Sequence, residues 1–470
     1  MSFSGSDNRA QTVCAISTPA GTGGIAVARL SGPDAFSILS RIWKGASLAD
    51  AASHTAHLGT IFNPADKSAL DQAIVTIFRS PHSFTGEDVA EISVHGSPWI
   101  QKRLIALLVE NGASPASAGE FTRRAFLNGR LDLAEAEAVA DMIASDSRSS
   151  HRLAMSQMRG DFSRRLSQLR TDLLELASLL ELELDFSEED VEFASRTRLI
   201  EVASQLIAEI DRLADSFSAG RAIREGVPVA ILGETNAGKS SLLNSLCGDD
   251  RAIVSDIAGT TRDTIDETLD IDGIRFRLTD TAGLRQTDDP VESIGIDRAI
   301  TTGRRASVVL WVIDPTTGTD SFGRLAPTIT EITASTGAQL IAVINKTDIG
   351  GDLTDKLATL ASTITPHVVE VSAKEGRGLD TLRRCITEST GLNNAMTENE
   401  VIVTNARHYQ ALRCASESLR RVLDGLTASL SGDFITQDLR EAIHHLGEIT
   451  GTITTPDILS TIFSRFCIGK

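Results

Sequence analysis

The sequence predicts an α/β protein in which a mostly parallel, doubly wound sheet is inserted into an all-helical domain, with a separate α/β domain before both. Three observations lead to this prediction. The N-terminal region consists of short β-like runs between Gly and Pro turns. Residues 226–388 alternate strand-like and helix-like segments, and the stretches on either side of them show helical periodicity.

The N-terminal region, residues 1–128, is predicted to be a compact α/β domain. Its strand-like runs are residues 25–30 (IAVARL), 73–78 (AIVTIF) and 90–94 (AEISV). Short apolar runs that end at Gly or Pro are typical of strands joined by tight turns.

Residues 129–225 and 389–470 are predicted to be the two halves of one helical domain. Leucines recur in each half at the spacing of one helix face. They are Leu169, Leu173, Leu176, Leu180 and Leu184 in the first half, and Leu412, Leu419, Leu423, Leu426 and Leu430 in the second. Residues 185–190 (DFSEED) interrupt the first pattern and can cap a second helix.

Residues 226–388 are predicted to hold the doubly wound sheet. The expected strands are residues 227–232, 275–279, 307–313, 339–344 and 368–371. Helix-like segments separate them, and this alternation is typical of a parallel sheet with helices on both faces.

The composition excludes several classes of protein. Apolar residues make up 41% of the chain and charged residues 23%, as in ordinary folded proteins. The five cysteines form no C-x-x-C pair, so reduced thiols are expected rather than a disulfide framework or a zinc ribbon. We find no apolar leader and no run of membrane-spanning length, and we expect a cytoplasmic protein. The net charge of −18 argues against nucleic-acid binding over the whole surface, but allows a local basic patch or a basic partner.

A glycine-rich segment follows the first strand of the sheet. Residues 233–240 (GETNAGKS) match G-x-x-x-x-G-K-[ST] between an apolar strand and a helix-like run. In such a loop the backbone N–H groups surround phosphates, Lys239 supplies charge to the β- and γ-phosphates, and the Ser240 hydroxyl ligates Mg²⁺. The motif predicts a nucleoside-triphosphate site. A plain glycine-rich turn is the alternative, and the motifs that follow make it less attractive.

Further motifs stand at the ends of other predicted strands. Residues 280–283 (DTAG) provide Asp280, which can hold Mg²⁺ through water, and the Gly283 N–H, which can contact the γ-phosphate. Residues 345–348 (NKTD) provide Asp348, whose carboxylate can accept two hydrogen bonds from guanine. Because adenine offers no such pair of donors, this motif selects GTP over ATP.

The remaining nucleotide motifs narrow the mechanism. Residues 372–374 (SAK) follow a strand and can support the base, and residues 255–263 (SDIAGTTRD) stand where a first switch loop belongs, with Thr261 as the second hydroxyl ligand of Mg²⁺. Leu284 stands where Ras-type enzymes have the glutamine that orients water. Arg262 and Arg285 are candidate arginine fingers, although a solvated surface arginine is the more ordinary interpretation.

The predicted GTP-binding residues are Gly233, Asn236, Ala237, Gly238, Lys239, Ser240, Ser241, Ser255, Asp256, Ile257, Ala258, Gly259, Thr260, Thr261, Asp280, Thr281, Ala282, Gly283, Asn345, Lys346, Asp348, Ser372, Ala373 and Lys374.

At this point the sequence resembles the MnmE (TrmE) family of tRNA-modification GTPases. The likeness rests first on residues 256–263 (DIAGTTRD), on the loop containing Asn236 and on the terminal residues 466–470 (FCIGK). It extends over essentially the whole chain, through residues 85–88, Glu91, residues 95–96, 119–121, 124–128 and 131–137. The resemblance implies a P-loop G domain at 226–388 and a folate-binding, dimerising domain at 1–128.

The resemblance also implies how GTP is hydrolysed. In this family K⁺ and dimerisation of two G domains activate hydrolysis, and a fixed monovalent cation can replace the charge of an arginine finger. The implied K⁺ ligands are the Asn236 side chain and backbone oxygens of Ser255, Ile257 and Thr260. The implied catalytic residues are Lys239 and Glu292, and Glu292 would orient the attacking water. The alternative for Asn236 is an ordinary loop residue, and from the residues alone Glu292 would be a solvated helix residue.

For the N-terminal domain the resemblance implies a site for 5-formyl- or 5,10-methylene-tetrahydrofolate. The matching positions are Arg29, Glu91, Arg130 and Lys470. Arg29 and Lys470 would face folate carboxylates and Glu91 the pterin. Surface ion pairs are the alternative. Arg130 stands where other members often have Lys, Ser255 replaces a common Thr, and Glu234–Thr235 replaces an Arg-Pro-like pair, but none of these changes removes an implied ligand.

The resemblance finally implies partners and a reaction. A homodimer would form a heterotetramer with a flavoprotein of the MnmG (GidA) type, which brings FAD and NADH. Together they would add an aminomethyl or carboxymethylaminomethyl group to carbon 5 of the wobble uridine of certain tRNAs. Two alternatives stay open: a purely regulatory GTPase whose N-terminal domain is only a dimerisation scaffold, and a ribosome-assembly GTPase such as Era or EngA, which lack the N-terminal domain and the terminal FCIGK.

Overall fold

The computed structural model describes residues 11–185, 196–248, 266–280, 303–317, 319–349, 352–392, 401–428, 430 and 432–469. The chain divides into two compact units. The first contains residues 1–143, 156–206 and 417–470, and the second contains residues 144–155 and 207–416. The predicted domain limits at residues 128, 225 and 388 stay predictions.

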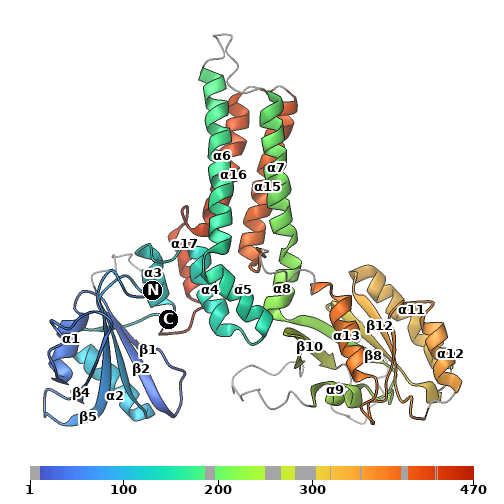
Figure 1. Cartoon of the computed structure of the whole chain (residues 1–470), viewed down its shortest axis with the longest axis horizontal. Coiled ribbons are helices and arrows are strands. Elements are labelled where there is room, and N and C mark those ends of the chain that lie inside the picture. Colours follow the sequence, from blue (N-terminus) through green and yellow to red (C-terminus); the bar gives the residue numbers. More distant parts are fainter. Residues whose placement is uncertain are drawn as a thin grey trace. The chain divides into compact units, whose positions relative to one another are not determined.

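A mixed sheet forms the N-terminal part of the first unit (Figure 1). Its strands are β1 (Val13–Ile16), β2 (Gly23–Ser31), β3 (Trp43–Gly45), β4 (Thr55–Phe62), β5 (Ala69–Phe78), β6 (Val89–Gly96) and β7 (Ser114–Pro115). Their order is β3-β4-β5-β6-β2-β1-β7, and the strands pair antiparallel except for β1 with β7. The strands predicted in this region are therefore confirmed within β2, β5 and β6.

One face of this sheet is covered by α1 (Ala35–Ile42) and α2 (Pro98–Glu110). Side chains alternate between the two faces of a strand, so Ala73, Val75 and Ile77 of β5 lie in the core beneath these helices. Ile74 points to the other face, where Leu58 of β4 is its cross-strand neighbour. Both of these side chains are exposed.

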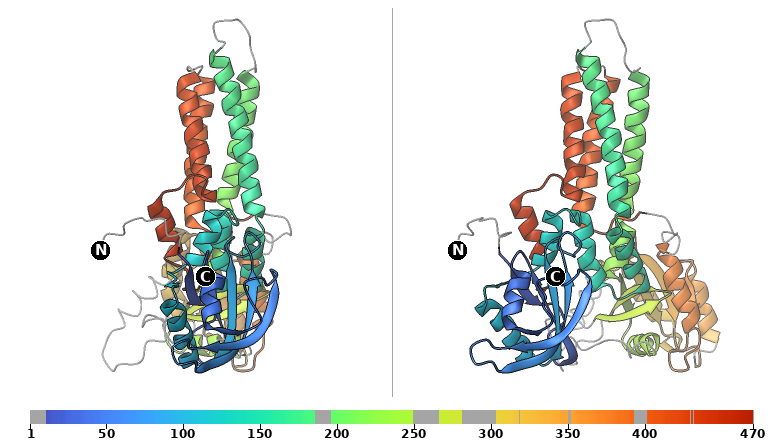
Figure 2. Two further views of the ribbon diagram at one scale, coloured as in Figure 1. Left: turned by 90° about the vertical axis from the view of Figure 1, so that its left-hand side faces the viewer. Right: turned by 60° about the vertical axis from the view of Figure 1, so that its left-hand side comes forward.

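The helical part of the first unit is built on leucine packing. Its elements are α3 (Glu120–Leu127), α4 (Leu133–Ala144), α6 (Asp161–Asp185), α16 (Gly432–Thr450) and α17 (Pro456–Phe463), and the boundary between the units falls within α5 (Arg148–Met158), α7 (Arg196–Asp215) and α15 (Ala406–Thr427). Helix α6 packs lengthwise against α16, as Figure 2 also shows. The predicted leucines 169, 173, 176 and 180 are all buried, which confirms the amphipathic helix.

The second predicted leucine pattern continues one turn beyond the end of the helix in the structure. Leu412, Leu419 and Leu426 are buried on α15, but the helix ends at Thr427 and the side chain of Leu430 is 49% exposed. The Leu430 N–H instead donates to the carbonyl of Gly425, a bond that closes the C-terminus of the helix.

The C-terminal tail returns to the N-terminal sheet. Helix α17 packs on α3, and Ile468 forms an isolated β-bridge with Ala118. The Ser17 hydroxyl donates to the Gly469 carbonyl at 2.9 Å. The last described residues of the chain therefore lie against the end of β1.

A second sheet organises the other unit. Its strands are β8 (Val227–Gly233), β9 (Asp266–Ile271), β10 (Ile274–Asp280), β11 (Val308–Ile313), β12 (Gln339–Ile344) and β13 (Val368–Glu370). They follow the order β13-β12-β11-β8-β10-β9, and only β9 with β10 is antiparallel among the described pairs. The mostly parallel sheet predicted from the sequence is confirmed.

Helices cover both faces of this sheet, because its strands are apolar on both sides. Helices α9 (Lys239–Cys247) and α13 (Leu379–Ser389) share one core cluster with α8 (Phe217–Glu225). Helices α11 (Thr319–Thr336) and α12 (Asp352–Ala361) share the other, and a short 3₁₀ turn, η3 (Pro315–Thr317), follows β11. The doubly wound arrangement is thereby confirmed.

Strand β9 was not predicted. It forms a hairpin with β10 through Asp272 and Gly273, whose φ angles are 53° and 81°. An Asp-Gly pair with two positive φ angles is a preferred two-residue hairpin turn. The sequence therefore contained a recognisable signal for this hairpin. The Gly273 carbonyl accepts a hydrogen bond from the Ser149 N–H at the start of α5. Arg275 of β10 forms an ion pair with Asp146.

Within the described residues, the structure contains no helix that combines the length and the apolar character needed to cross a bilayer.

Candidate nucleotide-binding site

The predicted nucleotide motifs meet at one edge of the second sheet. Strands β8, β10, β11, β12 and β13 run parallel, so their carboxyl ends lie at a common edge. The loop after Gly233, Asp280, Asn345 and Ser372 all follow or end these strands. In open α/β sheets this edge is where ligands bind.

The loop of residues 233–240 has the conformation that its glycines allow. Gly233 and Gly238 have φ angles of 155° and 88°. A Cβ atom at Gly233 would overlap with the Val312 carbonyl, and one at Gly238 would overlap with the Asn345 side-chain amide. Each position therefore needs glycine for both its backbone angle and its surroundings.

Lys239 is buried and held over this loop. Its ammonium donates hydrogen bonds to the carbonyl oxygens of Gly233 at 2.9 Å and Glu234 at 2.7 Å. Ser240 and Ser241 follow in the first turn of α9 and are exposed. The positive end of a helix, an ammonium group and exposed hydroxyls are the groups that bind phosphate and Mg²⁺.

Asn345 joins three loops of the site. Its Nδ2 donates to the carbonyl of Ala237 in the phosphate loop at 3.0 Å, and its Oδ1 accepts from the Ala373 N–H at 3.1 Å. The side chain is buried. This one amide therefore links the phosphate loop directly with residues 372–374.

Asp348 is prepared to accept hydrogen bonds as a carboxylate. The Ser372 hydroxyl donates to its Oδ1 at 2.8 Å, and this hydrogen bond lowers the pKa of Asp348. The carboxylate is therefore ionised at neutral pH. Ser372 also accepts from the Glu375 N–H at 3.3 Å, which fixes the hydroxyl.

One contributor to this site was missed from the sequence. Asp314 follows β11 directly, is buried, and pairs with Lys346 at 2.6 Å. The Lys346 ammonium also donates to the carbonyl of Asn236 at 2.8 Å. No short motif marks Asp314, because its partner lies 32 positions away in the sequence.

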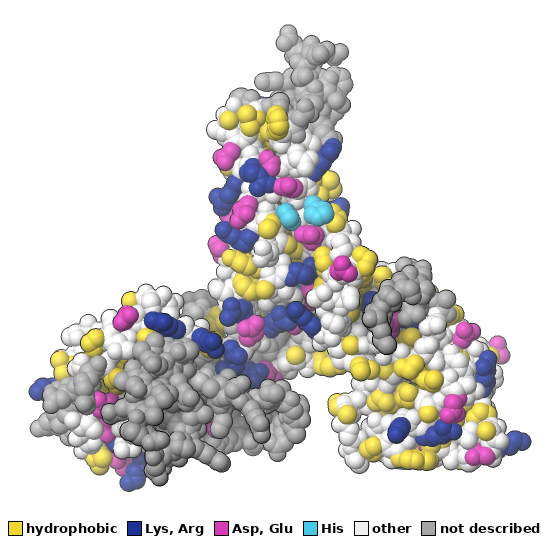
Figure 3. Space-filling model, turned by 180° about the vertical axis from the view of Figure 1, so that it is seen from behind, with side chains coloured by type: hydrophobic (Ala, Val, Ile, Leu, Met, Phe, Trp, Pro, Cys, Tyr) yellow, Lys and Arg dark blue, Asp and Glu magenta, His cyan; other side chains and the backbone are white. Residues whose placement is uncertain are grey.

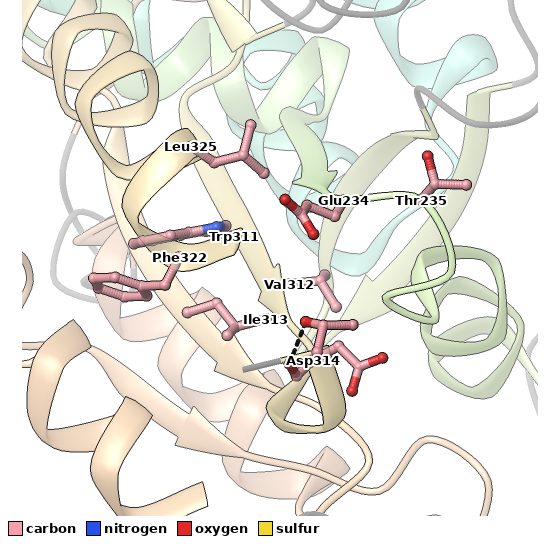
Figure 4. Close-up of a pocket in the computed structure, with 9 residues that line it drawn as sticks. Glu234, Thr235, Trp311, Val312, Ile313, Asp314, Phe322 and Leu325 are labelled. Atoms are coloured by element: carbon pink, nitrogen blue, oxygen red, sulfur yellow. Dashed lines mark hydrogen bonds between the residues drawn. The ribbon is translucent and has the colours of Figure 1, made fainter. Parts of the chain in front are cut away.

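A crevice lies beside the start of the phosphate loop (Figure 4). Glu234 and Thr235 border it on the loop side, and Trp311, Asp314 and Phe322 border it on the β11 and α11 side. Its volume of about 10 Å³ has room for no more than a water molecule, so it is not the nucleotide site.

Several predicted site residues lie outside the described residues or lack a described side chain. Asp280 is placed by its backbone opposite Ile231, at the same edge as the phosphate loop. The positions outside the description are Ser255, Asp256, Ile257, Ala258, Gly259, Thr260, Thr261, Arg262, Thr281, Ala282, Gly283, Leu284, Arg285, Glu292 and Lys470. Their predicted roles stay predictions.

The predicted folate residues meet in the first unit. Arg29 donates to the Glu91 carboxylate from Nε at 3.0 Å and from Nη2 at 2.7 Å. Its guanidinium also lies 5.4 Å from the centre of the Phe84 ring. Phe84 and Arg130 line one surface cavity of about 440 Å³, together with His54, Phe78, His82 and Ser83. Phe84 thus connects the Arg29–Glu91 pair with Arg130, and the predicted role of Arg29 toward a folate carboxylate stays a prediction.

A buried ion network lies behind this cavity and was also missed. Arg124 donates to both oxygens of Glu87, at 3.1 and 3.0 Å, and to Glu120 at 3.2 Å. Arg124 is only 2% exposed and Glu120 is also buried. Burial by itself would raise the pKa of Glu120, but the Ser117 hydrogen bond and the charges of Arg123 and Arg124 outweigh it and lower that pKa.

His, Cys, Asp and Glu side chains, the usual metal ligands in proteins, are all present in the described parts of the chain. No group of three or more His, Cys, Asp or Glu side chains is arranged there to hold a metal ion. At the phosphate loop, the Ser240 hydroxyl is a hard oxygen ligand of the kind that suits Mg²⁺ bound together with a nucleotide.

Two family models match the chain. The one described as the GTP-binding protein TrmE N-terminus covers residues 12–130, and the one described as the MnmE helical domain covers residues 133–467.

Curated relatives match over nearly the full length. The tRNA modification GTPase MnmE of Bacteroides thetaiotaomicron is 47% identical over 467 residues, which is 98% of this chain and 99% of that protein. The tRNA modification GTPases MnmE of Parabacteroides distasonis and Porphyromonas gingivalis are each 47% identical over 98% of this chain, and over 100% and 98% of those proteins. With its phosphate loop and guanine motifs at one sheet edge, this chain belongs to the MnmE (TrmE) family of GTPases.

Proposed function

We propose that this GTPase acts in the cytoplasm with a flavoprotein of the MnmG (GidA) type to modify carbon 5 of the wobble uridine of certain tRNAs. A tetrahydrofolate would supply the one-carbon unit. The observation that carries the proposal is the presence in one chain of a guanine-nucleotide site and of the Arg29–Glu91 pair beside the Arg130 cavity. The full-length relatives named tRNA modification GTPase support the same conclusion.

The proposed nucleotide contacts follow from the geometry of the loops. The amides of residues 236–241 and the Lys239 ammonium would bind the phosphates, and Asp348 would accept hydrogen bonds from guanine. Asn345 keeps the two loops in register through Ala237 and Ala373. Discrimination against adenine would come from the ionised state of Asp348, which the Ser372 hydrogen bond favours.

For hydrolysis we propose Mg²⁺ at Ser240 and Thr261, K⁺ at Asn236, Ser255, Ile257 and Thr260, and Glu292 as the group that orients water. When bound, the two cations would supply positive charge beside the phosphates. Asn236 is exposed in the phosphate loop, so an ion can reach it from solvent. Dimerisation of two G domains would complete the site and gate the joint reaction.

The N-terminal domain would bind folate and form a constitutive homodimer. Phe84, Phe78 and Arg130 offer aromatic walls and a cation for an aryl carboxylate, and Glu91 can accept hydrogen bonds from a pterin. Ile468 forms a β-bridge with Ala118, the Gly469 carbonyl accepts from Ser17 at the end of β1, and Lys470 follows them in the sequence as the proposed last folate ligand.

The open face of the N-terminal sheet supports self-association. Ile25, Leu58 and Ile74 lie there with exposed fractions of 69%, 67% and 47%. Arg29 and Glu91 are on the same face, because Ile74 pairs with Ser93, two residues from Glu91, in the β5–β6 ladder. Exposed apolar side chains beside a ligand site are typical of an interface.

A basic partner would hold most of the tRNA. The chain carries a net charge of −18, and a polyanion would be repelled by such a surface. On the face seen in Figure 3, acidic and basic side chains alternate along the helical part and form no continuous basic stripe. The partner, rather than this chain, would therefore supply FAD, NADH and the positive surface.

The first test measures GTP turnover in KCl and in NaCl for the wild type, Asn236→Ala and Glu292→Ala. We expect strong stimulation by K⁺, abolished by either substitution. Thr235→Ala is the matched control, because Thr235 is the exposed neighbour of Asn236 and is not a proposed ligand. Equal wild-type rates in the two salts would refute the K⁺ site.

The second test separates the proposed function from its alternatives. Calorimetry with 5-formyl-tetrahydrofolate should show binding that Arg130→Ala abolishes, whereas a purely regulatory GTPase should not bind folate. Mass spectrometry of tRNA nucleosides from a deletion strain should show loss of the modified wobble uridine. Intact modification in that strain would favour a role in ribosome assembly instead.

A further inference from the structure

Asp314 is a buried carboxylate at the edge where the nucleotide motifs meet. It follows β11 directly and only 6% of it is exposed. Figure 4 shows it beyond the end of that strand, beside the crevice that Glu234 and Thr235 also border. A buried carboxylate is costly unless it is paired, so its partners indicate what it does.

Both carboxylate oxygens of Asp314 are occupied. Oδ1 accepts from the N–H and hydroxyl of Thr316, at 2.8 and 2.7 Å, and Oδ2 accepts from the Lys346 ammonium at 2.6 Å. Burial acts to raise the pKa of Asp314, but the hydrogen bonds from Lys346 and Thr316 outweigh burial and lower it. The group is therefore a carboxylate in the folded protein.

The same ammonium reaches the phosphate loop. Lys346 Nζ donates to the carbonyl of Asn236 at 2.8 Å. Asn236 and Lys346 have φ angles of 64° and 57°, a conformation that residues other than glycine rarely adopt. A flexible lysine can stabilise such a loop only if its ammonium is held in place, and Asp314 is the described carboxylate that holds it.

We infer that Asp314 is a positioning residue of the nucleotide site: it fixes Lys346, and Lys346 in turn holds the phosphate loop at Asn236 against the guanine-recognition segment 345–348. The inference rests on the proposed nucleotide contacts. It adds a second tie between these loops beside that of Asn345 to Ala237. Asp314 touches no nucleotide atom in this scheme and acts only through Lys346.

The test measures release of fluorescent N-methylanthraniloyl-GDP from the full chain by stopped flow. Asp314→Asn keeps the shape of the side chain but removes its charge. A charge-assisted hydrogen bond is stronger than a neutral one, so we expect roughly ten-fold faster release. Asp380→Asn is the control, because Asp380 forms an exposed ion pair with Arg383 on α13, and its release rate should equal that of the wild type.

A double-mutant cycle distinguishes positioning from general weakening of the fold. If Asp314 acts through Lys346, Asp314→Asn should accelerate release in the wild type but add nothing in a Lys346→Met background. A buried residue that merely stabilises the domain would add its effect in both backgrounds. Should Asp314→Asn not fold, Asp314→Ser takes its place, because a hydroxyl can still accept from Thr316 and carries no charge.

The outcomes separate this inference from the proposal on which it rests. Wild-type chain that fails to bind the fluorescent GDP would overturn the proposed site. Wild-type binding with unchanged release in the folded Asp314 variant, or additive effects in the cycle, would overturn the positioning role alone.

Discussion

Replacing Arg124 by Met tests the buried ion network of the N-terminal domain. The guanidinium makes three hydrogen bonds, at 3.0, 3.1 and 3.2 Å, to the carboxylates of Glu87 and Glu120. Met fills most of the volume but leaves these two carboxylates without their common cation. Removing one partner of a buried ion pair costs about 3–5 kcal/mol. We therefore expect the free energy of unfolding to fall by this amount at neutral pH.

In this variant, the pH dependence of the unfolding free energy should change in sign as well as in size. The lowered pKa of Glu120 means that its contribution is complete above the ordinary glutamate pKa, and is lost as pH falls through the lowered value. In Arg124→Met the buried Glu120 keeps Ser117 and Arg123 but loses the hydrogen bond and the charge of Arg124, so burial should raise its pKa. The unfolding free energy of the variant should then rise as pH falls from 7 to about 5, where that of the wild type stays level.

Hydrogen exchange followed by mass spectrometry measures the loss of stability in Arg124→Met locally, on the backbone amides of α3. A loss of about 3–5 kcal/mol corresponds to exchange roughly two to four orders of magnitude faster. Arg103→Met is the matched control, because Arg103 pairs with Glu110 in a partly exposed ion pair at 2.8 Å and should cost less than about 1 kcal/mol. Equal effects of the two substitutions, or parallel pH profiles for Arg124→Met and the wild type, would contradict the reasoning.

Three further predictions concern the ligand sites. Gly238→Ala should abolish tight GDP binding, because its Cβ would overlap with the Asn345 amide, and calorimetry that finds wild-type affinity would contradict this. Ser372→Ala should move the acidic loss of GDP affinity to higher pH, since the hydroxyl that lowers the pKa of Asp348 is gone; an unshifted profile between pH 4 and 7 would count against it. Gly469→Ala should weaken folate binding but leave GTP turnover intact, because its Cβ would overlap with the backbone of β1; calorimetry and a GTPase assay on one preparation decide this.

The sequence predicted the sheet of residues 226–388 well, because its evidence is local. Each strand is a short apolar run, and each motif begins within a residue or two of a strand end. The spacing of Gly233, Gly238 and Lys239 encodes a loop whose backbone angles at the first two of these positions favour glycine. The conformation of this loop could therefore be predicted from the sequence alone. Parallel pairing then brings motifs more than a hundred residues apart to one edge.

What the sequence did not predict depends on contacts between distant residues. Asp314 and Lys346, or Arg124 and Glu87, carry no local pattern that marks them as partners. Strand β9 was missed because three of its six residues, Asp266, Glu267 and Asp270, are acidic and of low strand propensity, although its turn was recognisable. The leucine pattern ran past Thr427 because periodicity does not show where a helix ends.

The β9–β10 hairpin can transmit a conformational change of the nucleotide domain to a neighbouring helix. In the chain it joins residues 249–265, which contain the predicted first switch loop, to residues 281–302, which contain Glu292. Its two strands are joined by a tight turn and by a ladder of backbone hydrogen bonds, and β10 is also paired with β8 in the sheet. Its far end is fastened to α5 through the Ser149 N–H and through Asp146. A shift of this hairpin within the sheet would therefore be passed directly to the residues at the start of that helix.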